Sequence, residues 1–253
     1  MTHDRDPAAN AFRNATGRSL EEDNGADQVR YRAYQRDLIR PHCGPSLLEV
    51  GSGLGEFAEG FTGFHRHVLT DVDPGAVALL RNRFAGRPEV ETRQLDLAAA
   101  AAGAVIDDAP AVATALAINV LEHIEDDAGA LRAMASVVTP GGTVVIWVPG
   151  YQQLYGDFDR AVGHVRRYTP SSLREAFHRA GLQPEEVRPV NLLGGIAWWL
   201  TVRRGGVGAP NPRLVAIYDR FVVPCTRVLE RAFTPPFGQS ILGVARVPRS
   251  RAG

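Results

Sequence analysis

The sequence predicts an α/β protein whose core is a doubly wound, mostly parallel sheet. Short apolar runs, typical of buried strands, alternate with stretches of helical pattern in the first three fifths of the chain. One run leads into a turn with three glycines at alternate positions, and Pro140-Gly141-Gly142 separates a helical stretch from a later apolar run. Strands and helices that alternate in this way pack as a parallel sheet covered by helices.

The first strand, residues 47–50, ends in a turn suited to hold a ligand. It contains Glu49 and is followed by Gly51, Gly53 and Gly55. Glycines let a backbone approach a ligand closely, and the start of the next helix offers free amide groups. A dinucleotide fingerprint would need a third glycine at position 56, but Glu56 stands there and would repel a pyrophosphate. We therefore expect a nucleotide-like ligand without phosphates.

Two further strands end at acidic residues. Residues 67–70 lead to Asp71, which follows the first glycine by about twenty residues, the usual distance for a carboxylate that accepts ribose hydroxyls. Asp73 is expected to cap the following helix. Residues 90–95 lead to Asp96, for which a solvated loop position is an alternative.

The fourth strand, residues 113–118, runs into Asn119. Asp126 is expected to cap a helix that continues to Val138. The Pro-Gly-Gly segment then ends this helix, and residues 144–148 form a fifth strand.

The acidic-x-Gly-x-Gly-x-Gly turn and the segments after it resemble, in this order, the class I S-adenosylmethionine-dependent methyltransferases. The resemblance implies a Rossmann-like, seven-stranded sheet with a sixth strand at 186–190 and an antiparallel last strand at 240–247. It implies S-adenosylmethionine as the cofactor, with Asp71 on the ribose and with Asp96 and the amide of Leu97 on the adenine. The residues assigned to the cofactor are Glu49, Gly51, Ser52, Gly53, Gly55, Asp71, Val72, Asp96, Leu97 and Asn119.

Composition restricts the function classes. The formal net charge is +0, so the chain lacks the basic footprint of a nucleic-acid enzyme, and we expect no nucleic-acid partner. Two distant cysteines favour a reducing cytoplasm, and no apolar run approaches the roughly 20 residues needed to span a bilayer. All 28 basic residues are arginine, which excludes a lysine nucleophile and suggests a GC-rich, bacterial genome.

The expected parts are a mobile N-terminal tail (1–26) and one domain (27–253), which contains a lid (149–169) and a helical insertion (191–239). The tail is polar and shows no sustained period. The start of the domain fits a helix that Pro41 closes. Tyr31 or Tyr34 of this helix either packs in the core or reaches the methionine part of the cofactor.

The lid interleaves aromatic, charged and histidine side chains, as expected of a loop over a pocket. Its tract Tyr-Gly-x-x-Asp-x-x-x-Gly-His-x-Arg-Arg-Tyr resembles a bacterial subfamily of these methyltransferases. The residues assigned to the substrate are Tyr151, Tyr155, Arg166, Arg167 and Tyr168. The two arginines either grip a substrate carboxylate or phosphate or pair with Asp157 and Asp159 inside the lid.

The insertion contains two tryptophans, Trp198 and Trp199, and an apolar helix at 213–233. One face of this helix is expected to gather Leu214, Ile217, Tyr218, Phe221 and Val228. The residues expected to face solvent are Arg213, Asp219, Arg220, Arg227 and Arg231. We favour a pocket cap or a dimer face over a membrane-surface helix, although the arginines and tryptophans keep the membrane alternative open.

His164 and His123 are the histidines placed to act as a general base, and a structural role is the alternative for each. The pair Glu122-His123 resembles one found in quinone O-methyltransferases, where an acidic residue three places earlier helps bind a metal. Asn119 stands at that place, so we expect no metal.

Together these features predict a methyltransferase that acts on an oxygen or nitrogen atom of a small molecule in bacterial secondary metabolism. One alternative is a lipid-linked or glycan acceptor at the membrane. The other is an S-adenosylmethionine-binding protein that transfers no methyl group.

Overall fold

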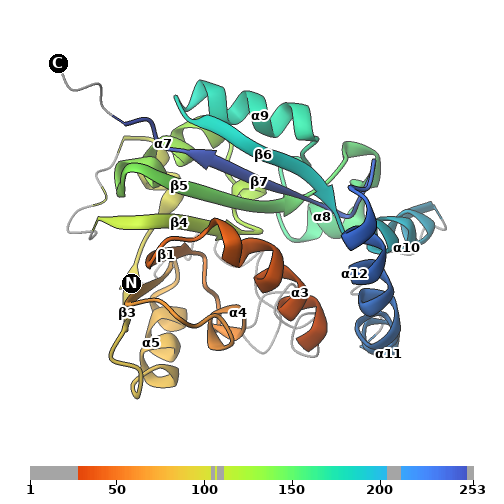
Figure 1. Ribbon diagram of the computed structural model, residues 1–253, viewed down its shortest axis with the longest axis horizontal. Helices are drawn as coiled ribbons and strands as arrows, with labels where there is room; N and C mark the ends of the chain where they lie inside the picture. Colours follow the sequence, from red (N-terminus) through yellow and green to blue (C-terminus); the bar gives the residue numbers. More distant parts are fainter. Residues whose placement is uncertain (1–27, 104–105, 107–110, 204–211, 250–253) are drawn as a thin grey trace, which may run out of the picture.

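The computed structural model describes residues 28–103, 106, 111–203 and 212–249 (Figure 1). The tail expected at 1–26 lies outside this part of the chain. The described strands are β1 (Ser46–Val50), β2 (Arg66–Asp71), β3 (Val90–Gln94), β4 (Val112–Ile118), β5 (Val138–Pro149), β6 (Gln183–Val190) and β7 (Ser240–Arg246). They form one seven-stranded sheet in the order β3-β2-β1-β4-β5-β7-β6.

The strand directions confirm the predicted fold class. β1 to β5 pair in parallel, whereas β7 runs antiparallel to both β5 and β6. Val50, the last residue of β1, pairs with Thr70 of β2 and with Ala117 of β4. The carboxyl ends of these three strands therefore meet at one edge of the sheet.

Helices cover the sheet on both sides, with α7 and α9 on one side and α3 on the other (Figure 1). The described helices are α3 (Val29–Ile39), α4 (Glu56–Glu59), α5 (Pro74–Arg83), α6 (Leu97–Ala101), α7 (Asp127–Ser136), α8 (Asp157–Ala161), α9 (Pro170–Arg179), α10 (Leu192–Arg203), α11 (Pro212–Ile217) and α12 (Val223–Ala232). Short turns are η1 (Arg40–His42), η2 (Leu121–His123), η3 (Gln152–Leu154) and the π-helical η4 (Tyr218–Val222). Asp73 and Asp126 cap α5 and α7, as predicted.

The core follows the twofold period of the strands. In β5, Val144 and Ile146 pack into the cluster beneath α7 and α9, while Val145 and Trp147 pack into the cluster beneath α3. Successive strand residues point to opposite faces, so an unbroken apolar run marks a strand buried on both sides.

The fifth strand begins earlier than predicted. The Pro-Gly-Gly segment belongs to β5, whose first residue Val138 pairs with Val112 of β4. The register shifts between Val112 and Thr114, which accommodates the irregular segment within the ladder. The segment therefore bends the strand instead of preceding it.

The helix predicted at 213–233 is divided into α11, η4 and α12. Pro224 in the first turn of α12 has no N–H to donate to the carbonyl of Arg220. The guanidinium of Arg30 donates to that carbonyl instead. A π-helical turn at a proline is the expected result of losing this backbone bond.

The prediction that Asp219 faces solvent is wrong. Asp219 is 7% exposed and accepts hydrogen bonds from the amides of Arg30, at 3.1 Å, and Tyr31, at 2.8 Å. These amides lie in the first turn of α3, where backbone donors have no partner in the helix and negative charge is stabilising. The insertion is thereby oriented with Asp219 inward.

Four of the five residues predicted for the apolar face consequently turn outward, whereas Tyr218 is partly buried and its hydroxyl donates to Asn191 at 2.7 Å. Leu214, Ile217, Phe221 and Val228 are 64%, 53%, 59% and 66% exposed, respectively. In the described part of the chain, no helix combines the length and the apolar character needed to cross a membrane.

Candidate active site

The glycine turn lies where the order of the strands reverses. In the sheet β1 lies between β2 and β4, so the chain continues from β1 to one side through β2 and β3 and then returns to the other side with β4. Ligands bind at such a reversal of strand order in open α/β sheets. Gly51, Gly53 and Gly55 have φ of 71°, 53° and 79°. A Cβ atom on Gly51 would lie 2.5 Å from Cγ2 of Val120, directly after β4. The turn and the end of β4 are thus in close contact.

Asp71 lies beside this turn at the end of β2. Its carboxylate accepts hydrogen bonds from the amide of Gly53, at 2.9 Å, and from the amide of Asp73, at 3.0 Å. Asp71 is half-buried, whereas Val72 is 56% exposed. A carboxylate next to an exposed apolar side chain suits a hydroxylated sugar and the base attached to it.

Glu49 and Ser52 have buried side chains at the end of β1 and the start of the turn. The Glu49 carboxylate is buried, with Oε2 3.2 Å from Nε2 of His67, and the Ser52 hydroxyl donates to the carbonyl of Glu49. The Glu49 side chain stabilises the packing of β1 against β2 from within. The cofactor roles assigned to Glu49 and Ser52 remain predictions.

Asp96 and Asn119 mark the ends of β3 and β4. Asp96 is exposed and accepts a hydrogen bond from the amide of Ala99 at 2.9 Å, so it caps α6, and the side chain of Leu97 is buried in the core. Asn119 has φ of 52°, in the left-handed region that asparagine tolerates better than most residues. The cofactor roles of Asp96, Leu97 and Asn119 remain predictions.

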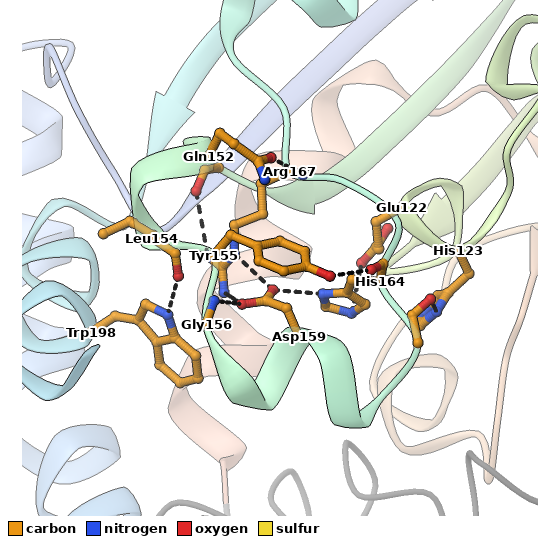
Figure 2. A network of polar contacts seen from close by, with 12 residues as sticks. Glu122, His123, Gln152, Leu154, Tyr155, Gly156, Asp159, His164, Arg167 and Trp198 are labelled. Atoms are coloured by element: carbon orange, nitrogen blue, oxygen red, sulfur yellow. Dashed lines mark hydrogen bonds and ion pairs between the residues drawn. The ribbon is translucent and has the colours of Figure 1, made fainter. Parts of the chain in front are cut away.

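The two predicted catalytic histidines lie against each other in the loops beyond β4 (Figure 2). The ring centroids of His123 and His164 are 4.7 Å apart in an edge-to-face arrangement. Nδ1 of His123 lies 3.3 Å from the carbonyl of Gly163, and Nε2 of His164 lies 3.9 Å from Oε1 of Glu122. Glu122 is fully buried. The structure thus brings His123, from the turn after β4, together with His164 from the lid and with the carboxylate of Glu122. Glu122 follows Val120 by two residues in the chain.

Asp159 holds His164 in place. Its carboxylate lies 2.8 Å from Nδ1 of His164 and accepts two further hydrogen bonds from Arg167, at 2.7 and 3.0 Å (Figure 2). Burial alone would raise the pKa of Asp159, but the hydrogen bonds from His164 and Arg167 and the charge of Arg167 lower the pKa below its ordinary value. The carboxylate is therefore ionised and fixes the orientation of the imidazole ring.

The predicted pairing of the lid arginines with lid carboxylates is confirmed for Arg167 and Asp159 but not for Arg166. Arg166 donates to Asp127 at 2.9 Å and to the carbonyl of Glu125 at 2.8 Å, both outside the lid. These contacts tie the lid to the loop before α7. Arg167 is buried like His164, and its guanidinium is bonded to Asp159.

The three lid tyrosines differ in exposure. Tyr168 is 1% exposed and donates to Asp127 at 3.2 Å, and burial raises the pKa of this phenol. The Tyr155 hydroxyl donates to the carbonyl of His164 at 2.7 Å. Tyr151 and Tyr155 are both half-buried, and Tyr151 has a left-handed backbone with φ of 62°. Tyr151 and Tyr155 are thus better placed than Tyr168 to line a substrate site.

A metal is a rival occupant of the histidine cluster. The ligand atoms of Glu122, His123 and His164 all lie within 4.8 Å of one another. Two imidazoles and a carboxylate suit a transition metal better than a hard cation, which prefers oxygen ligands. The cluster could hold such an ion, so metal dependence has to be tested directly.

The sequence did not predict that Asp159 and Asp127 hold the site together through hydrogen bonds with lid residues. Asp159 entered only as an alternative partner of an arginine, and Asp127 had no assigned role. Both contacts depend on short segments that fold back, α8 for Asp159 and the start of α7 for Asp127. The Asp-x-x-x-x-His spacing of the lid is the signal from which the pair of Asp159 and His164 could have been predicted.

Comparison with known families settles the relationship of this chain. The sequence model of a family described as a methyltransferase domain matches residues 3–187, more than half of the chain. The chain belongs to this family. The resemblance to the methyltransferase family is therefore confirmed, while no curated protein sequence matches this chain.

Solved structures similar to this methyltransferase confirm its Rossmann-like fold. One chain of the Haloferax volcanii complex between the Trm112 activator and a methyltransferase has a TM-score of 0.61 at 17% identity, covering 90% of this chain and 95% of that chain. The N-methyltransferase NodS from Bradyrhizobium japonicum, in complex with S-adenosyl-L-homocysteine, has a TM-score of 0.53 at 15% identity, covering 91% and 99%. The [4+2]-cyclase SpnF has a TM-score of 0.56 at 15% identity, covering 91% and 95%.

Proposed function

We propose that this chain is an S-adenosylmethionine-dependent methyltransferase acting on an oxygen or nitrogen atom of a small molecule. Membership of the methyltransferase family supports methyl transfer, and NodS and CalH, which share the fold, were solved with S-adenosyl-L-homocysteine. The observation that carries the proposal is the contact between the glycine turn and Val120, two residues before the buried Glu122 and its histidine neighbours. A cofactor site and a proton-accepting site thus share one edge of the sheet.

The residues at the turn fit the cofactor. A carboxylate has about four acceptor sites, so the two amide donors at Asp71 leave capacity for ribose hydroxyls. Val72 offers apolar surface to the base, and Gly51 and Gly53 present their backbone without side chains. Asn119, with Asp96 and Leu97 at the end of β3, completes the proposed set. Glu56 at the start of α4 is compatible with a ligand that carries no phosphate.

His164 is the proposed general base. The cofactor, when bound, supplies a methyl group on a positively charged sulfur. A hydroxyl acceptor would lose its proton as its oxygen bonds to the methyl carbon, and a neutral amine would lose one once its nitrogen has bonded, with the electron pair of the broken methyl–sulfur bond left on the sulfur. Nε2 of His164 takes the proton because Nδ1–H is donated to Asp159. Glu122, 3.9 Å from Nε2, stabilises the imidazolium that results. His123 is the second candidate for this step.

Orientation accounts for much of the proposed rate enhancement. Alignment of the reactants lowers the activation free energy by roughly 7 to 11 kcal/mol, whereas a general base usually raises the rate by a factor of about 10² to 10⁴.

Tyr151 and Tyr155 are the proposed lining of the acceptor site. Arg166, Arg167 and Tyr168 are proposed to shape the lid through their internal contacts.

We retain bacterial secondary metabolism and the cytoplasm as the proposed setting. The two cysteines, Cys43 and Cys225, are both free thiols, as is common in a reducing compartment.

A rearrangement without methyl transfer is the second candidate function, and the likeness to the cyclase SpnF supports it.

The two candidates differ in the fate of the cofactor. Purified protein would be incubated with methyl-deuterated S-adenosylmethionine and panels of phenols, catechols, primary amines and secondary amines. The expected result is formation of S-adenosylhomocysteine in a one-to-one ratio with a deuteromethylated product. Conversion of an acceptor to an isomer while the cofactor stays intact would instead establish the second candidate.

A further inference from the structure

The helical insertion presents an apolar surface that the described residues of the fold leave exposed. Of the 13 large hydrophobic residues that are exposed in the described chain, nine lie in this segment. They are Ile196, Trp199, Leu200, Leu214, Ile217, Phe221, Val228, Leu229 and Phe233. Figure 1 shows α10, α11 and α12 together at one end of the molecule, beyond the edge of the sheet. An exposed apolar patch of this kind marks an interaction surface.

Sequence spacing places exposed residues within α10, and within α11 and η4, on a shared face of each segment. In α10, Ile196, Trp199 and Leu200 follow at intervals of three and four residues, which share a helix face. Leu214 and Phe221 are separated by seven residues, or two helical turns, across α11 and η4. The apolar surface therefore extends along the insertion instead of forming at a single loop.

Arginines border this surface. Arg213, Arg220 and Arg227 follow at intervals of seven residues, each one position before an exposed apolar residue, and Arg231 follows four residues later. The guanidinium of Arg220 lies over the ring of Phe221 at 5.6 Å. Arg213, Arg220 and Arg231 are exposed, whereas Arg227 is half-buried and pairs with Asp37 of α3.

The acidic side chains of the insertion point inward. Asp219 accepts the amides at the start of α3, as described above, and Glu230 accepts the hydroxyl of Tyr34 and the amide of Leu192. Asp219 is buried and Glu230 is half-buried, so the charged residues that are exposed among the described residues of the insertion are arginines. A second copy of the same surface would bring arginines together without carboxylates to pair them, which disfavours self-association.

We propose that the α10–α12 surface docks on an anionic phospholipid bilayer, with its apolar side chains in the headgroup region and its arginines on lipid phosphates. Tryptophan and phenylalanine on the apolar side and arginine at the border are typical of helices that lie in a membrane interface. Each arginine near an anionic surface adds to the attraction. The charge of the insertion thus favours a negative bilayer over a neutral one.

The same insertion is attached to the lid of the candidate site. Trp198 of α10 is half-buried, and its indole N–H donates to the carbonyl of Leu154 at 3.0 Å (Figure 2). Its ring packs edge-to-face on Phe158, and Arg167 lies over it at 5.3 Å. Docking would therefore place the lid next to the membrane, within reach of an acceptor that partitions into lipid. The docking itself does not depend on methyl transfer.

Vesicle flotation tests the proposal with matched variants. Wild-type protein should float with vesicles of equal parts phosphatidylcholine and phosphatidylglycerol, and much less with phosphatidylcholine alone. Leu214→Ser combined with Phe221→Ser should reduce the bound fraction at least about tenfold, because both exposed apolar contacts are lost. Leu79→Ser, at an exposed position of α5, should leave binding unchanged. Arg231→Ala should weaken binding about fivefold, and Arg81→Ala should not.

Two further measurements keep the test decisive. Tryptophan fluorescence of the wild type should be quenched by brominated phosphatidylglycerol, and Trp199→Phe should reduce the quenching. This substitution keeps an apolar aromatic side chain at position 199, so the reduced quenching does not depend on disrupting the apolar surface. The proposal is overturned if the wild type does not float, or if the double variant floats as well as the wild type. It is also overturned if light scattering shows a wild-type dimer that the double variant dissociates, since a second copy would then cover this surface.

Discussion

Gly55 combines a left-handed backbone with a crowded surrounding. Its φ is 79°, and a Cβ atom would lie 2.6 Å from Cε2 of Phe84 and 2.8 Å from Cδ2 of Leu80. We expect Gly55→Ala to lower the free energy of unfolding by about 1 to 3 kcal/mol, from the left-handed conformation and the overlap together. Urea denaturation monitored by circular dichroism measures this change.

Gly86 is the matched control for this substitution. A Cβ atom there would meet nothing within 4 Å, and its φ is outside the left-handed region. Gly86→Ala should therefore change the free energy of unfolding only slightly. Equal stabilities for the two variants would contradict the role assigned to the packing of the turn against α5.

His164 should matter for turnover more than for substrate affinity. His164→Gln is expected to reduce kcat about 100-fold with little change in KM, because the proton acceptor is lost while the cofactor turn is untouched. The comparison is His178→Gln, at an exposed position of α9, which should keep wild-type kinetics. A wild-type kcat for His164→Gln would return this histidine to a purely structural role.

The histidine cluster is proposed to work without a metal. Dialysis against EDTA should therefore leave kcat unchanged, and metal analysis of the active protein should find substoichiometric content. Loss of activity that Mn²⁺, Fe²⁺ or Zn²⁺ restores would show instead that Glu122, His123 and His164 bind an ion.

Single residues were predictable where a local motif defines them. Asp71 and the three glycines follow from the strand-to-helix turn, and the structure places them side by side. Asp127 carries no comparable signal, because its partners Arg166, Tyr168 and Arg179 come from the lid and from α9. A contact of this kind depends on how distant segments pack.

At the level of elements, the lid is held by the ion pair between Asp159 and Arg167. The pKa of Asp159 is lowered by its hydrogen bonds, so ionised Asp159 stabilises the folded state at neutral pH. Asp159→Asn should lower the free energy of unfolding by about 3 kcal/mol at neutral pH, since it leaves a buried guanidinium uncompensated.

This difference should depend on pH in a defined direction. The stabilisation is present above the ordinary pKa of 3.8 and is lost as the pH falls below it towards the lower pKa of the folded state. The free energies of unfolding of wild type and Asp159→Asn should therefore converge in acid. A constant difference from neutral pH to pH 3 would contradict the assigned ionisation.

The insertion shows how a correct pattern can be assigned to the wrong side. The sequence correctly groups Leu214, Ile217, Phe221 and Val228 but wrongly adds Tyr218, which packs inward, and the stripe alone does not say which face is buried. Asp219 decides the orientation through the first-turn amides of α3, nearly 190 positions away in the chain. Pro224 likewise indicates a break in the helix, yet the π-helical turn depends on Arg30 reaching the carbonyl of Arg220.

For the whole molecule, the order of the strands was the most predictable feature. Alternating apolar strands and capped helices define a doubly wound sheet, and the connections are short enough to permit few other topologies. The position of the lid against the histidine pair was less predictable, because it depends on α8, α10 and the loop after β4 packing together. The single domain expected at 27–253 remains a prediction.

The central claim is that the turn and Asp71 bind S-adenosylmethionine, and calorimetric titration tests it most directly. The wild type should bind S-adenosylmethionine and S-adenosylhomocysteine but not NADH, and Asp71→Ala should weaken both at least about tenfold through loss of hydrogen bonds to a charged group. Asp73→Ala, which removes only the cap of α5, should bind like the wild type. Binding of NADH alone, or unchanged affinity in Asp71→Ala, would contradict the account.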